Sequence, residues 1–131
     1  MSDDSIKLVR LFLLVEAVSF ALAALPHYGI LGGVYESQPT AIIVHSSIAG
    51  ELFLGFALTW FRRARTRAIA LTVQGVAVFA ALVGVLTIAM GIGPQTVPEI
   101  GFHSGIVVVL AVAIAISWRA SRNSSGWVRK Q

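Results

Sequence analysis

The side chains best suited to chemistry in this sequence are three histidines, at positions 27, 45 and 103. Neutral imidazole is the commonest protein ligand for metal ions. His45 and His103 each come five residues after the start of a long apolar run, which at the rise of a helix puts both about 8 Å below one membrane boundary. This matched depth predicts two imidazoles that meet, as axial ligands of a haem b iron or as ligands of a transition-metal ion. The alternative is a plain hydrogen bond between helices, worth about 0.6 kcal/mol on average.

Two further residues extend this candidate site. Glu99 precedes His103 by four residues, so the two share a helix face. A metal version of the site would use His27, His45, Glu99 and His103, whose nitrogen and oxygen atoms suit zinc, copper or iron. Plainer explanations exist for both additions: Glu99 opens its apolar run, where the helix dipole stabilises a carboxylate, and His27 follows Pro26 at the interface, which favours a solvated loop residue.

Glu16 and Glu51 are predicted to lie deeper, at roughly 14 and 16 Å by the same count. No basic residue lies at that depth, so both carboxyls cannot be ionised cheaply and at least one is expected to be protonated. Intramembrane carboxyls commonly handle protons or substrates. The alternative is a neutral carboxyl hydrogen-bonded to Ser19, Ser47 or a backbone carbonyl.

Helical spacing limits which of these residues belong together. Glu16 and His27 are eleven residues apart, which at about 100° per residue places them within about 20° on one polar stripe. His45 and Glu51 are six residues apart and point about 120° away from each other. The sequence therefore predicts a histidine layer and a carboxyl layer that need not form one site.

Four apolar runs must position these side chains. The chain has 131 residues, 56% hydrophobic and 12% charged, against about 25% charged in soluble domains. Each run has the roughly 20 residues needed to cross a bilayer core; the runs cover residues 6–25, 40–61, 68–90 and 98–118. We therefore predict an all-α integral membrane protein: one domain over residues 1–120, a four-transmembrane-helix antiparallel bundle with short loops, and a flexible cytoplasmic tail over residues 121–131. Pro26 is expected to end the first run.

The basic residues predict the orientation. All ten Lys and Arg lie within the first five residues of the first run, between the second and third runs, or after the fourth, and loops 26–39 and 91–97 contain none. The positive-inside rule then places both termini in the cytoplasm, in a plasma (bacterial inner) membrane. A cleaved signal peptide is the alternative for the first run, but Glu16 within its apolar part favours a retained span. Attraction to anionic lipid explains the pI near 10.4 without nucleic acid.

Other absences narrow the function. The chain has no cysteine, which excludes thiolate metal sites and thiol catalysis. It has no phosphate-binding loop, nucleophile elbow or HExxH pair, so no catalytic residue is assigned. In length and number of spans it resembles small bacterial four-span membrane proteins, including those of the DoxX type.

We expect a small membrane protein with an outer-leaflet histidine site for haem or a transition metal, acting in electron transfer or metal handling. One alternative is a proton-coupled transporter that uses Glu16 and Glu51. Others are an accessory subunit of a larger membrane complex, or an enzyme with Glu and His as acid and base. Besides the lipid bilayer, a second copy is a candidate partner, because Gly101 and Gly105 would let another helix approach closely.

Overall fold

The computed structural model describes residues 1–29, 38–92 and 95–119. Four long α-helices make up nearly all of these ranges, and each is long and apolar enough to cross a membrane. They are α1 (Asp3–His27), α2 (Pro39–Phe61), α3 (Thr66–Ala89) and α4 (Val97–Arg119), with a short 3₁₀ turn, η1 (Arg63–Arg65), between α2 and α3. The helix ends lie within three residues of the predicted spans. The predicted tail, residues 121–131, lies outside the described residues.

Helix α1 does not end at Pro26, as the sequence analysis expected, but continues to His27. Proline lacks only one backbone donor, and its fixed φ fits a helix, so a proline in the last turn removes a single hydrogen bond. The Tyr28 N–H then donates to Leu25 O at 3.2 Å, and Gly29 turns the chain with φ of +72°. His27 is therefore a helical residue whose direction is set by the periodicity of α1.

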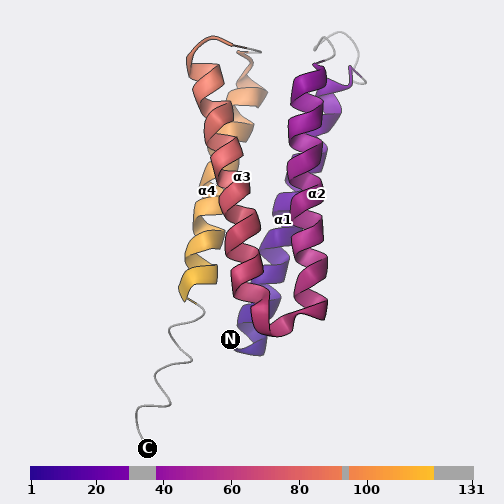
Figure 1. The fold of residues 1–131 in the computed structure, drawn as a ribbon. Coiled ribbons are helices and arrows are strands. Elements are labelled where there is room, and N and C mark those ends of the chain that lie inside the picture. The colour runs from indigo at the N-terminus through magenta and orange to yellow at the C-terminus, as the bar shows by residue number, and fades with distance from the viewer. Residues whose placement is uncertain (30–37, 93–94, 120–131) are drawn as a thin grey trace, which may run out of the picture.

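The helices form two pairs, α1 with α2 and α3 with α4 (Figure 1). The start of α1, the turn η1 and the end of α4 lie at one end of the molecule, and the end of α1 and the starts of α2 and α4 lie at the other (Figure 1). The two ends therefore carry different parts of the sequence, one with most of the basic residues and one with the histidines.

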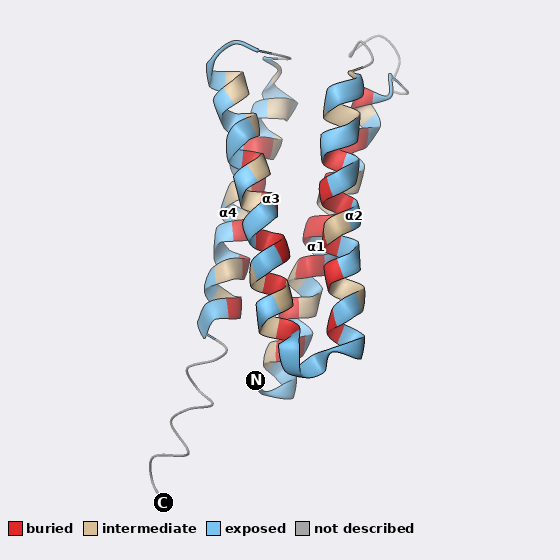
Figure 2. Ribbon diagram, in the orientation of Figure 1, coloured by how far each residue is buried: buried red, intermediate tan, exposed pale blue. Residues whose placement is uncertain are grey.

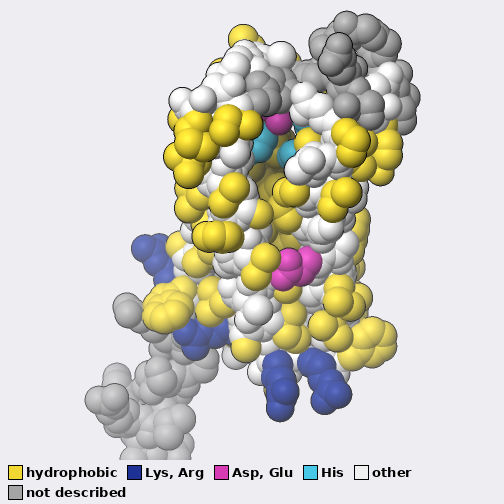
Figure 3. Space-filling model, turned by 45° about the horizontal axis from the view of Figure 1, so that its top comes forward, with side chains coloured by type: hydrophobic (Ala, Val, Ile, Leu, Met, Phe, Trp, Pro, Cys, Tyr) yellow, Lys and Arg dark blue, Asp and Glu magenta, His cyan; other side chains and the backbone are white. Residues whose placement is uncertain are grey.

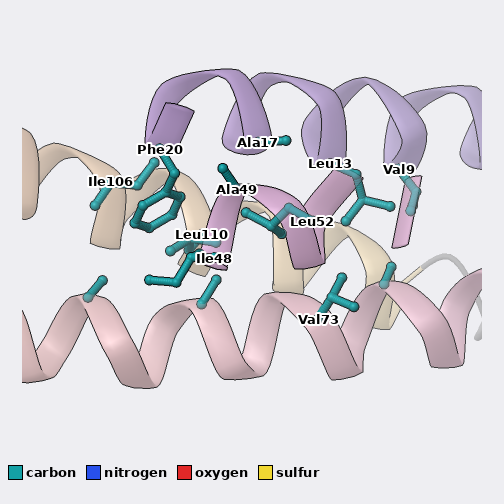
Figure 4. Close-up of a cluster of buried hydrophobic side chains, with 13 residues drawn as sticks. Val9, Leu13, Ala17, Phe20, Ile48, Ala49, Leu52, Val73, Ile106 and Leu110 are labelled. Atoms are coloured by element: carbon teal, nitrogen blue, oxygen red, sulfur yellow. The ribbon is translucent and has the colours of Figure 1, made fainter. Parts of the chain in front are cut away.

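The core is a narrow stripe down the inside of the bundle (Figure 2). Phe20 of α1 points toward Ile48 of α2 and Leu110 of α4, and Leu13 lies near Leu52 further along (Figure 4). The outer faces are apolar as well: each helix has large side chains that are more than half exposed, among them Leu22, Leu54, Phe79 and Val108. So much exposed apolar surface fits helices surrounded by lipid and not by water.

The end that carries η1 is held by arginines. Arg10 donates to the backbone oxygen and the hydroxyl of Thr59, at 2.6 and 3.1 Å, and its guanidinium lies 4.0 Å above the Trp60 ring. Arg63 forms an ion pair with Asp3. Arginine and tryptophan at one level are typical of the membrane interface, where an apolar body and a polar end are both accommodated.

Candidate metal site

The three histidines and Glu99 come together at the end of the bundle away from η1. His27 lies in the last turn of α1, His45 in the second turn of α2, and Glu99 and His103 in the first two turns of α4. Figure 3 shows histidine and acidic side chains gathered in a hollow at this end, with arginines at the opposite end. The His45 and His103 rings are in edge-to-face contact, with centroids 5.8 Å apart and an interplanar angle of 74°.

His27 is buried in this cluster, so its interpretation as a solvated loop residue is wrong. Its exposed fraction is 1%. The ring stacks on His45 at a centroid distance of 5.1 Å, and its Nε2 lies 3.6 Å from Glu99 Oε1. The reason is the helical continuation through Pro26, which keeps His27 on the same buried face as Phe20 and Ala24.

His27, His45 and Glu99 have the geometry of a potential metal site, because one ligand atom from each lies within 4.8 Å of the others. A tetrahedral ion with bonds near 2.1 Å holds its ligand atoms about 3.4 Å apart, so shifts of roughly 1 Å would close the site. His45 Nδ1 donates to Ala41 O at 2.8 Å. A carbonyl only accepts, so this bond places the ring proton on Nδ1 and leaves the Nε2 lone pair for a ligand, as in most metal-binding histidines.

His103 belongs to the cluster but not to this trio. Its Nδ1 donates to Glu99 O at 3.0 Å and lies 3.7 Å from Glu99 Oε1. The other edge of the ring, with Nε2, packs against Gly84 of α3, where an added Cβ would overlap Nε2 and Cδ2. His103 therefore faces the carboxylate with one nitrogen and the neighbouring helix with the other, a position suited to orienting Glu99.

Gly84→Ala is therefore expected to destabilise the bundle by about 1–3 kcal/mol, because the new methyl group must displace a ring held by a hydrogen bond. The measurement is the free energy of unfolding in mixed detergent micelles, followed by circular dichroism. In the double variant Gly84→Ala, His103→Ala the clash is gone, so the cost of Gly84→Ala should largely disappear. An equal cost in both backgrounds would contradict this packing.

The surroundings of His45 and His103 favour a single ion over haem. Axial ligation would require a flat macrocycle between the two imidazoles. The rings instead touch each other, and Phe102 and Phe20 lie 5.7 and 6.1 Å from the His45 ring. An ion needs no such opening.

Glu16 lies in a separate buried network. The Gln74 side-chain amide donates to both carboxyl oxygens of Glu16, at 3.1 and 3.3 Å, and the Ser117 hydroxyl donates to Gln74 Oε1 at 3.2 Å. All three side chains have exposed fractions of 0%. Ser19, an expected partner of Glu16, instead donates to Val15 O. Sequence reasoning missed the partnership with Gln74, although a glutamine inside an apolar run was a visible signal.

Glu51 is only partly buried on α2. Within residues 1–29, 38–92 and 95–119 no hydrogen bond or ion pair joins it to Glu16 or to the histidines. The structure therefore brings together the four candidate metal ligands and leaves the two deeper carboxyls apart.

Comparison with protein-family models, with curated proteins and with solved structures found no match to this chain. The geometry of the site is therefore the basis on which a function is inferred.

Proposed function

We propose that this chain is a membrane protein that binds one transition-metal ion at the outer end of its four-helix bundle. The observation that supports this is the convergence of two imidazoles and a carboxylate from three different helices on a space 4.8 Å across. His27, His45 and Glu99 are 18 and 54 residues apart in the chain, so their meeting follows from the fold and not from local sequence.

The free energy of burying these polar side chains also supports a bound metal ion. Polar groups removed from water cost free energy unless they are paired, and a bundle in lipid offers few pairing groups. A cation bound to all three side chains would offset that cost, because metal binding free energy adds to folding free energy. Two nitrogens and one oxygen suit Zn²⁺, Cu²⁺ or Fe²⁺ and leave a further coordination position open, as in sites that handle or react with ligands.

The same proposal includes the orientation: an antiparallel bundle in a bacterial plasma membrane with both termini in the cytoplasm. Supporting it are the ten basic residues of the sequence, which avoid the two loops at the histidine end. Arg10 over Trp60 and Arg67 over Trp118 fit the cytoplasmic interface. The metal site then faces the outside, where it meets ions before they cross the membrane.

The test is a Co²⁺ titration of detergent-purified, chelator-treated protein, followed by visible absorption, with elemental analysis of the untreated sample. We expect about one ion per chain, with affinity that falls as pH falls because protons compete for the imidazoles. The matched variant is His27→Ala. If wild type binds Co²⁺, Zn²⁺ and Cu²⁺ no better than this variant, the proposal is overturned.

A further inference from the structure

A cavity of about 280 Å³ lies beside the metal site, between α2, α3 and α4. An engineered cavity of about 150 Å³ in another protein is large enough to bind benzene. The cavity therefore has room for a six-membered ring with substituents, although not for a whole membrane lipid.

The cavity is mainly apolar, with walls that include Ile48, Ala81 and Ile88. Its polar lining residues are His45, Glu99 and His103, together with Gln38, Thr40 and Thr87. An occupant that matches these walls is mainly apolar and ends in an oxygen: a hydroxyl donates to the carboxylate or to the His45 Nε2 lone pair. No Lys or Arg of the described chain is among the lining residues, so a phosphate headgroup would find no counter-charge.

The shape of the walls favours a flat occupant. On α3 the lining includes Ala80 and Ala81, whose side chains are single methyl groups, and Gly84, against which the His103 ring lies. Phe20 contributes an aromatic ring from the side of α1, and such rings pair favourably with other rings.

The route into the cavity leads from the lipid. Val44 of α2 and Val83 of α3 line the cavity and are also 41% and 44% exposed. Figure 3 shows the hollow bordered by hydrophobic side chains. A molecule dissolved in the outer leaflet would thus enter between α2 and α3.

We propose that this cavity binds a lipid-soluble quinol, with the ring against α3 and a ring hydroxyl that donates to Glu99 or to His45 Nε2. This deepens the proposed function, because it names the ligand class that meets the same cluster. It does not depend on the metal for its walls, so the two proposals can fail separately.

The experiment measures saturable binding of a labelled decyl-substituted benzoquinol, kept reduced in the absence of oxygen, to the full chain in lipid nanodiscs. Ala80→Phe fills the cavity, and Ala89→Phe adds the same ring at an exposed position on α3 outside the lining. We expect about one probe per chain for wild type and Ala89→Phe, and a loss of at least about tenfold in affinity for Ala80→Phe. Equal binding by the two variants, or only unsaturable partitioning into lipid, would overturn the proposal.

Two controls separate the remaining explanations. Decylbenzene has the same tail and ring without hydroxyls, and binding as tight as that of the quinol would refute the role of His45 and Glu99. Val83→Trp, which narrows the entrance, replaces Ala80→Phe if that variant does not fold. Co²⁺ binding is measured on the same samples: quinol binding without Co²⁺ binding overturns the metal site alone, and Co²⁺ binding without quinol binding overturns the cavity ligand alone.

Discussion

His45→Ala is expected to lower the affinity for Co²⁺ by at least about 100-fold, whereas His103→Ala should lower it by only about 10-fold. Removing a ligand costs at least as much as removing an outer partner of a ligand, for which losses of about 10- to 100-fold are typical. His45 has a ligand atom within 4.8 Å of those of His27 and Glu99, and its bond from Nδ1 to Ala41 O leaves Nε2 to coordinate. His103 directs Nε2 at Gly84, and its Nδ1, which donates to the Glu99 backbone oxygen, lies 3.7 Å from the Glu99 carboxylate. The measurement is the Co²⁺ titration described above.

The matched control for this pair is Glu51→Gln. It neutralises a carboxyl on the same helix as His45, about 9 Å further along, and should leave Co²⁺ affinity unchanged. If His103→Ala is as damaging as His45→Ala, then His103 is a ligand itself and the site closes on binding by turning that ring away from α3. If neither matters, the cluster is a hydrogen-bonded contact between helices.

The depth of a side chain along its span could be predicted from the sequence, because a helix rises by a fixed amount per residue. Equal distances from the start of two apolar runs placed His45 and His103 at one level, and their rings do touch. The four apolar helices could be predicted for a similar reason, since a bilayer demands a minimum length of apolar chain.

The burial of His27 could not be predicted from the rise per residue or from the length of the apolar run. A proline usually signals the end of a helix, and Pro26 was interpreted in that way. In the last turn, however, proline costs only one hydrogen bond, and the two further helical residues, Pro26 and His27, bring His27 into the cluster. Two residues of helix thus separate a solvated loop histidine from a buried ligand candidate.

The arrangement of neighbouring helices also could not be predicted from the sequence. Glu16 was expected to bond to serines or to backbone, but its partner Gln74 is 58 residues away on α3. Helical spacing gives the direction of each side chain relative to its own helix, and it does not give the rotation of one helix against another. That rotation comes from packing of the whole bundle.

Gln74→Leu is expected to destabilise the bundle by about 2 kcal/mol. A single hydrogen bond between membrane helices averages only about 0.6 kcal/mol, but this substitution leaves both Glu16 and Ser117 buried without their partner. Orphaned buried groups cost about 1–3 kcal/mol each in desolvation, of which relaxation recovers a part. The measurement is the free energy of unfolding in mixed micelles. The double variant Glu16→Leu, Gln74→Leu replaces the polar pair by apolar side chains of similar size and should recover most of the loss.

Glu16→Gln separates a structural role for this network from proton handling. Glutamine keeps the size of the side chain and accepts a hydrogen bond from Gln74, so we expect stability within about 0.5 kcal/mol of wild type. If proton-coupled uptake into proteoliposomes is observed for wild type and is lost in this equally stable variant, Glu16 handles protons. If Gln74→Leu proves neutral in stability, the buried network contributes nothing to the fold, and the reason for a carboxyl at this depth must then be sought in its chemistry.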